Sequence, residues 1–140
     1  MPDHYDETIT LPIKFERRFQ LWYYTVSFRV LLLRSNKDAN TPTRVDVMFR
    51  GVTEMRLPSQ LRNLTIGVLT ESDPRLAALG IQRTPEHHVF SLEADDFQGG
   101  YAVAWNMYFA EDEKMYDDES LLDTGQAIPE GAALRVGQYL

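Results

Sequence analysis

Carboxylates are the side chains of this sequence most able to do chemistry, and they gather in one segment. Seven acids and a single lysine lie between residues 111 and 123, in a chain of 140 residues whose formal net charge is −7. Residues 1–70 carry ten Lys or Arg against seven Asp or Glu, whereas residues 71–140 carry four against fourteen. A local excess of negative charge attracts cationic partners and speeds their association. The sequence therefore predicts an acidic surface that contacts a basic partner protein.

The partner contacts are expected to come from the acids of this segment, with one aromatic residue as an anchor. An aromatic side chain among charged residues is a frequent arrangement at energetically important interface positions. The predicted partner-binding residues are Glu111, Asp112, Glu113, Tyr116, Asp117, Asp118 and Glu119. The competing interpretation of the segment is a solvated loop that only increases solubility.

Other groups of potential ligands have spacings that do not favour a metal site. Glu93, Asp95 and Asp96 lie just before a Gly-Gly pair and could hold Ca²⁺ or Mg²⁺, but they match no EF-hand, and a turn explains them equally well. His87 and His88 are adjacent, so in a strand they would point to opposite faces and could not share a metal. The sequence has no cysteine, which excludes thiolate metal sites, disulfides and a cysteine nucleophile. We therefore predict neither a metal nor another cofactor.

No motif identifies an enzyme. The sequence lacks the G-x-S-x-G elbow and the glycine patterns of nucleotide-binding folds. Paired carboxylates for glycoside hydrolysis meet only in space, so the sequence cannot nominate a pair among 21 acids. Two alternatives to the protein-binding inhibitor stay open. One is a small carboxylate-dependent hydrolase or carbohydrate-binding domain, which a concave pocket lined by acids and aromatic residues would favour. The other is a structural subunit of a larger assembly.

The elements that must position these side chains are short β-strands. Leu21–Leu33 and Tyr101–Phe109 are long runs in which apolar residues recur every second position, which predicts strands with one buried face. Arg44–Arg50 predicts a third strand, with its valines and Phe49 inward and Arg44, Asp46 and Arg50 outward. The residues expected to be mostly buried are Tyr24, Val26, Phe28, Val30, Val47, Phe49, Ile66, Val103, Trp105 and Met107.

Trp22, Tyr23 and Tyr24 form an aromatic cluster within the first of these runs. Such a cluster, if exposed, could stack on a ligand or on a nucleic-acid base. The more ordinary interpretation is that the three residues belong to the core and rim of a sheet.

Turn signals separate the strands. Gly51 predicts a bulge or a tight bend, and Gly99-Gly100 predicts a hairpin loop. Asp73 is a suitable N-cap and Pro74 a suitable first helical residue, followed by a C-terminal Gly80. The expected fold is all-β, a mainly antiparallel sandwich or open barrel with at most one short helix near residues 74–79. We expect a single domain over residues 1–140, with an acidic C-terminal segment from about residue 111.

Composition also limits the compartment and the partners. The absence of cysteine and the acidic, polar N-terminus, which differs from a secretory signal, predict a cytoplasmic protein. No apolar run approaches the roughly 20 residues needed to span a bilayer, so no membrane contact is expected. Lys and Arg are scattered rather than gathered in a basic patch, so direct nucleic-acid binding is not expected. The oligomeric state is left open.

Residues 43–69 read TRVDVMFRGVTEMRLPSQLRNLTIGVL. This segment resembles the small β-rich immunity proteins of bacterial polymorphic-toxin systems, most clearly over Val45–Leu69. The resemblance lies in a strand followed by the patterns F-x-G-V, R-L-P and L-x-I. The resemblance implies a bacterial, cytoplasmic, non-enzymatic protein that acts by binding a cognate toxin. Contact residues in that family follow no motif, so the resemblance assigns no site residue.

Overall fold

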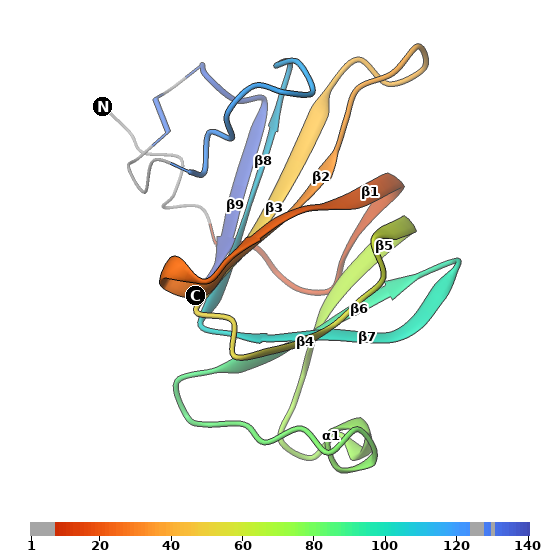
Figure 1. Cartoon of the computed structure of the whole chain (residues 1–140), viewed down its shortest axis with the longest axis vertical. Coiled ribbons are helices and arrows are strands. Elements are labelled where there is room, and N and C mark those ends of the chain that lie inside the picture. The colour runs from red at the N-terminus through yellow and green to blue at the C-terminus, as the bar shows by residue number, and fades with distance from the viewer. Residues whose placement is uncertain (1–7, 124–127, 130) are drawn as a thin grey trace.

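The computed structural model describes residues 8–123, 128–129 and 131–140. In this part of the chain, nine strands form one sheet in the order β4-β7-β6-β5-β1-β2-β3-β8-β9 (Figure 1), and every neighbouring pair is antiparallel. The all-β prediction is confirmed. The strands are β1 (Ile13–Thr25), β2 (Val30–Ser35), β3 (Arg44–Arg50), β4 (Glu54–Arg56), β5 (Gln60–Leu69), β6 (His88–Ala94), β7 (Phe97–Ala104), β8 (Asn106–Asp112) and β9 (Arg135–Tyr139).

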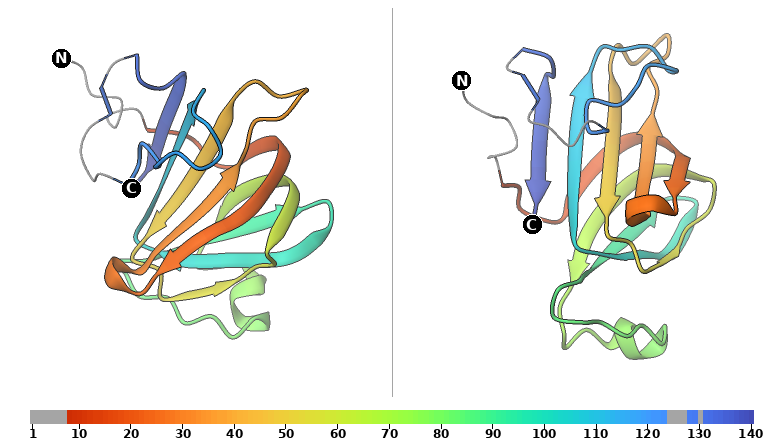
Figure 2. Two further views of the ribbon diagram at one scale, coloured as in Figure 1. Left: turned by 45° about the horizontal axis from the view of Figure 1, so that its top comes forward. Right: turned by 60° about the vertical axis from the view of Figure 1, so that its left-hand side comes forward.

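The sheet curls so that its inner face surrounds one hydrophobic core (Figure 2). Aromatic pairs cross this core between strands that are distant in the sheet order. The ring centroids of Phe49 and Phe90 lie 5.3 Å apart, and those of Phe90 and Tyr139 lie 5.8 Å apart. One continuous sheet whose end strands β4 and β9 do not pair corresponds to the open-barrel form of the prediction.

Period-two spacing correctly identified five buried residues, four of them in this core and Val103 in a smaller cluster on the outer side of the sheet. Val47, Phe49, Ile66, Val103 and Met107 are all at most 1% exposed. Successive residues of a strand face opposite sides of the sheet, so residues that recur every second position share the covered side. The burial prediction is confirmed for these five residues.

The run Leu21–Leu33 is not one strand, which corrects the prediction. The chain reverses through a 3₁₀ turn, η2 (Ser27–Arg29), so that β1 and β2 pair with each other and Tyr24 lies opposite Leu31. Val26 and Phe28 are therefore 87% and 86% exposed at the tip of a hairpin, where no core lies within reach. Tyr24 is exposed as well, and Val30 is only half-buried.

The run Tyr101–Phe109 is also interrupted. It forms β7 and β8, with a bend at Trp105, whose side chain is 51% exposed rather than buried. The ring of Trp105 lies against Gly51, where a Cβ atom would come within 2.2 Å of it. Gly51 has a φ of 70°, as expected at a tight bend, and it follows β3 directly.

The predicted helix is confirmed and one predicted loop is wrong. Helix α1 (Pro74–Ala78) begins after Asp73, whose side chain accepts a hydrogen bond from the Arg75 amide at 2.9 Å. Hydrogen bonds from the Arg75 guanidinium and from this amide lower the pKa of Asp73 to about 2. The Gly99-Gly100 pair lies inside β7, and the turn that joins β6 to β7 is formed by residues 95–96.

Two segments cover the outer side of the curled sheet. Residues of α1 and the following loop pack on β5, β6 and β7, where Ile81 contacts a small apolar cluster. The described residues between β8 and β9 include Leu122 and Ile128, which join Leu32, Met48 and Ala110 of β2, β3 and β8 in a second cluster. No helix in the described ranges is long and apolar enough to cross a membrane.

Arg44 and Asp46 alternate with the inward-facing Val45, Val47 and Phe49, and the second covering segment shields these two outward side chains from solvent. Both side chains are 0% exposed. Burial of charged groups is costly unless they are paired and hydrogen-bonded, so the segment over them must supply partners.

Tyr101 provides a test of the contact between β4 and β7. Its hydroxyl donates a hydrogen bond to the Glu54 carboxylate, which together with burial raises the pKa of Tyr101 to about 12. Because the folded pKa lies above the ordinary value of about 10, this contact stabilises the fold fully below pH 10 and is lost as the pH rises towards 12. We expect the difference in near-ultraviolet absorbance between wild type and Tyr101→Phe to titrate near pH 12. A midpoint near 10 would contradict the contact.

Candidate functional site

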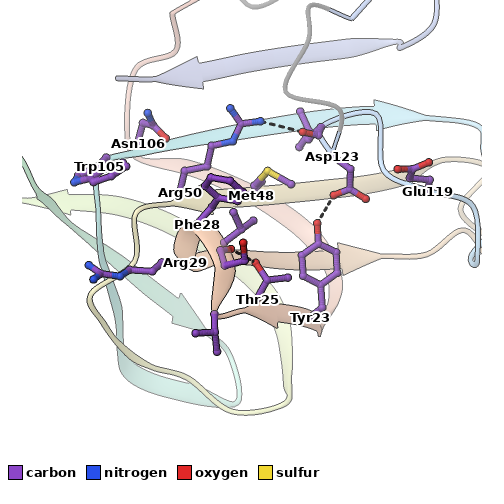
Figure 3. A pocket seen from close by; sticks show the side chains of 14 residues that line it. Tyr23, Thr25, Phe28, Arg29, Met48, Arg50, Trp105, Asn106, Glu119 and Asp123 are labelled. Atoms are coloured by element: carbon purple, nitrogen blue, oxygen red, sulfur yellow. Dashed lines mark hydrogen bonds between the residues drawn. The ribbon is translucent and has the colours of Figure 1, made fainter.

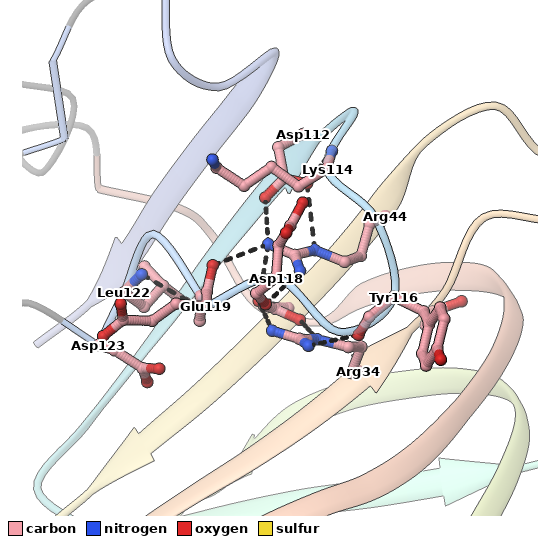
Figure 4. A network of polar contacts seen from close by, with 12 residues as sticks. Arg34, Arg44, Asp112, Lys114, Tyr116, Asp118, Glu119, Leu122 and Asp123 are labelled. Atoms are coloured by element: carbon pink, nitrogen blue, oxygen red, sulfur yellow. Dashed lines mark hydrogen bonds and ion pairs between the residues drawn. The ribbon is translucent and has the colours of Figure 1, made fainter.

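The acidic loop, defined here as residues 113–119, lies over the outer face of β2 and β3 and is held from below by two buried arginines (Figure 4). Arg34 donates to both carboxylate oxygens of Asp46, at 2.7 and 3.0 Å. Arg44 donates to both carboxylate oxygens of Asp112, at 3.1 Å each, and also lies 3.8 Å from Asp46. Two arginines and two aspartates thus form a network with balanced formal charge.

The remaining guanidinium donors reach the main chain of the acidic loop. Arg34 donates to the carbonyl of Tyr116 at 2.8 Å. Arg44 donates to the carbonyls of Met115, Asp118 and Glu119 at 2.9, 2.7 and 3.3 Å. The anchoring therefore uses carbonyl oxygens and leaves most side chains of the loop free to face outward.

The predicted partner-binding residues divide into two groups. Asp112 is buried under Arg44, and the half-buried Glu111 accepts a hydrogen bond from Thr43 at 2.6 Å and lies 3.8 Å from Arg17. Burial lowers the pKa of Arg17, and the charge of Glu111 opposes this effect. These two acids support the base of the loop and are not available to a partner.

The other predicted residues lie on the surface: Glu113, Tyr116, Asp117, Asp118 and Glu119 are exposed. The Asp118 carboxylate also accepts a hydrogen bond from the Met115 amide at 2.9 Å, so it helps to shape the loop. Met115 and Tyr116 are 55% and 59% exposed among these acids, which places two apolar side chains on the same loop.

A pocket of about 830 Å³ lies beside the acidic loop (Figure 3) and was not predicted from the sequence. Its lining comes from the β1–β2 hairpin tip, from the bend between β7 and β8, and from residues 119–123. Val26, Phe28 and Trp105, which period-two spacing placed in the core, are its exposed apolar residues. Their exposure would have been recognisable only if the two strand breaks had been known.

Charged residues lie on different sides of this pocket. Glu119 is the last residue of the acidic loop and Asp123 follows it closely, and the Tyr23 hydroxyl donates to Asp123. Burial and this hydrogen bond raise the pKa of Tyr23 above its ordinary value. Arg29 and Arg50 also line the pocket, and Arg50 donates to the Leu122 carbonyl at 3.0 Å.

The carboxylates near Gly99-Gly100 shape a turn. Glu93 accepts hydrogen bonds from the Gly99 amide at 3.2 and 3.3 Å, Asp95 accepts one from Asn63 at 2.7 Å, and Asp96 accepts one from the Arg62 amide at 2.9 Å. All three thus have structural partners.

The two histidines contact different neighbours. The ring centroids of His87 and Trp105 lie 6.2 Å apart, and those of His88 and Tyr139 lie 5.1 Å apart. Among the described residues, no group of three or more His, Asp or Glu side chains could hold a metal ion.

The aromatic cluster of β1 does not act as one surface. Trp22 is half-buried and the Arg34 guanidinium lies 4.7 Å from the centre of its ring. Of the three residues, Tyr23 lines the pocket, whereas Tyr24 is exposed elsewhere.

Comparisons of the chain with protein-family models, with curated proteins and with solved structures found no match. Function must therefore be argued from the acidic loop and the pocket themselves.

Proposed function

We propose that this protein is a binding protein whose acidic loop covers a basic site on a partner protein. Its concrete form is an immunity-type inhibitor that blocks a toxin in the bacterial cytoplasm by steric and electrostatic occlusion, without chemistry. The observation that carries the proposal is the anchoring of the loop by Arg34 and Arg44 through carbonyl oxygens. A loop that only increased solubility would need no such support.

The anchoring has two consequences that favour binding. A loop held in one conformation loses less conformational entropy when a partner docks, so more of the contact energy contributes to affinity. The exposed Tyr116 and Met115 supply apolar contacts among the acids, which suits a central anchor surrounded by charge.

Neutralisation of the loop acids tests the proposal. The partner is first captured from the native host, and its association is then measured over a salt series. We expect Glu113→Gln/Asp117→Asn/Glu119→Gln to lower the on-rate about tenfold at low salt and to weaken its salt dependence, because the surface field steers encounter. Tyr116→Ala should mainly raise the off-rate. These three acids are chosen because their side chains make no hydrogen bond that supports the loop.

The matched control removes the same charge elsewhere. Glu16, Glu71 and Glu86 are exposed and lie outside the loop, so Glu16→Gln/Glu71→Gln/Glu86→Gln should change the on-rate much less. If both triple variants associate at the same rate as wild type throughout the salt series, the acidic loop is not the interface.

The second candidate function is carbohydrate binding or carboxylate-dependent hydrolysis, and it draws on the concave pocket. The pocket combines aromatic residues with Glu119 and Asp123, an arrangement that suits sugars. Both acids are exposed, which disfavours the hydrolytic form of this alternative, because a catalytic general acid usually lies in a buried, apolar setting. Titration with neutral oligosaccharides, followed by the signal of Trp105, tests the binding form of this alternative.

A further inference from the structure

We propose that the pocket beside the acidic loop receives an arginine side chain and an adjoining aromatic side chain from the basic partner. This inference rests on the proposed function and adds the chemistry of the partner segment. The pocket and the acidic loop share one stretch of chain, since Glu119 belongs to the loop and also lines the pocket. A partner docked on the loop therefore lies next to the pocket.

The apolar side of the pocket is exposed at a conformational cost. Phe28 has a φ of 63° and Arg29 a φ of 51°, in the left-handed region that residues other than glycine rarely adopt. Strain of this kind persists where the surrounding structure enforces it, and it is concentrated at binding and catalytic sites. Here the strained turn holds the Phe28 ring at the pocket, where it gains little burial in the free protein.

The charged side of the pocket selects a cation. Glu119 and Asp123 lie together at the end next to Tyr23 (Figure 3), and only one oxygen of Asp123 is engaged by the Tyr23 hydroxyl. A guanidinium combines favourable stacking on aromatic faces with paired hydrogen bonds to carboxylates, which an ammonium does not match. Arginine therefore fits this end better than lysine.

The position of Arg29 sets the orientation of the ligand. Arg50 is engaged by the Leu122 carbonyl and lies 4.7 Å from the centre of the Tyr108 ring. Arg29 is exposed and is drawn on the side away from Glu119 (Figure 3). Arg29 therefore directs an incoming guanidinium towards the carboxylates of Glu119 and Asp123, which leaves the apolar part of the ligand near Phe28 and Trp105.

The size of the pocket calls for more than one side chain. Pockets of about 300–1,000 Å³ typically hold complete small ligands. A volume of about 830 Å³ thus has room for an aromatic side chain beside the arginine.

Titration of the full chain with N-acetyl-phenylalanyl-arginine amide tests the inference, with isotope-labelled protein observed by NMR. We expect the Trp105 indole signal and the amides of residues 26–29 and 119–123 to shift and saturate. The citrulline dipeptide, which keeps the shape without the charge, should bind about tenfold more weakly, and the glutamate dipeptide should bind still less.

Two variants with matched controls locate the contacts. Asparagine tolerates the left-handed conformation, so Phe28→Asn removes the ring without new strain and should weaken binding about tenfold. Glu119→Gln should reduce the preference for arginine over citrulline to about twofold or less. Leu134→Asn and Glu113→Gln change an exposed leucine and an exposed acid outside the pocket, and both should bind like wild type.

Several outcomes would overturn the inference. One is equal affinity for the arginine and citrulline dipeptides, and another is NMR shifts confined to residues outside the pocket. A third is an unchanged affinity of Phe28→Asn for the arginine dipeptide. The last is saturation of the pocket by neutral oligosaccharides without any response to the arginine dipeptide. The last outcome would assign the pocket to the carbohydrate-binding alternative. Glu119→Gln occurs in both sets of variants, so the separation rests on two other measurements: the dipeptide titration, which needs no partner protein, and Phe28→Asn, which leaves every acid of the loop intact. Failure of the pocket and failure of the proposed function are therefore distinguishable.

Discussion

Replacement of Arg44 by alanine is expected to lower the free energy of unfolding by about 3–5 kcal/mol, because removal of one partner from a buried ion pair leaves the other charge uncompensated. Arg44 is fully buried and forms ion pairs with both Asp112 and Asp46. The substitution would also leave the carbonyls of Met115, Asp118 and Glu119 without their guanidinium donor. Denaturant unfolding measures the stability loss, and proteolysis within residues 113–119 reports release of the loop.

The control for Arg44 is an arginine that is itself exposed and makes a paired contact of similar geometry with a half-buried aspartate. Arg75 donates to both carboxylate oxygens of Asp73, at 3.0 and 2.8 Å. Exposed ion pairs contribute little, because solvent and salt screen them, so Arg75→Ala should barely change the melting temperature. If Arg44→Ala and Arg75→Ala have equally small effects, the buried network does not anchor the loop.

Phe49→Ala is expected to cost about 3–5 kcal/mol, through lost burial and the cavity left behind. Phe49 is fully buried and packs against Phe90 across the core. The same change at Phe28 should leave stability within about 0.5 kcal/mol of wild type, as for other surface substitutions, because 86% of that side chain is already exposed. Thermal or denaturant unfolding of the two variants side by side is sufficient. A large loss from Phe28→Ala would mean that the hairpin tip packs against the body of the protein.

Phe49 and Phe28 show where alternation in the sequence predicts burial correctly and where it does not. The alternation around Phe49 predicted its burial because β3 runs uninterrupted between β2 and β8, where alternation and burial coincide. The alternation around Phe28 is just as regular, but it spans a chain reversal that no Gly, Pro or Asn marks between Thr25 and Arg29. The hydrophobic pattern indicates which side chains favour burial. It does not locate the chain reversal at residues 25–29, which lacks the usual turn signals.

The candidate site was predictable only in part, for a related reason. The density of acids at residues 111–123 located the loop, because charge is a local property of the sequence. The sequence could not separate Asp112 from Asp117, since only the fold places one beneath Arg44 and leaves the other in solvent. The pocket has lining residues from positions 23 to 123, so no local pattern could reveal it.

The carbonyl anchoring described for the acidic loop also bears on how this surface can change over evolution. Every residue type has the same main-chain carbonyl, so the hydrogen bonds from Arg34 and Arg44 do not depend on which side chains the loop carries. Substitutions at Glu113, Tyr116, Asp117 or Glu119 can therefore alter which partner is recognised while the loop keeps its path. Asp118 is the exception, because its carboxylate holds the Met115 amide. The β-sheet and its two arginines form a constant frame on which a variable recognition surface can be exchanged, in nature or by design.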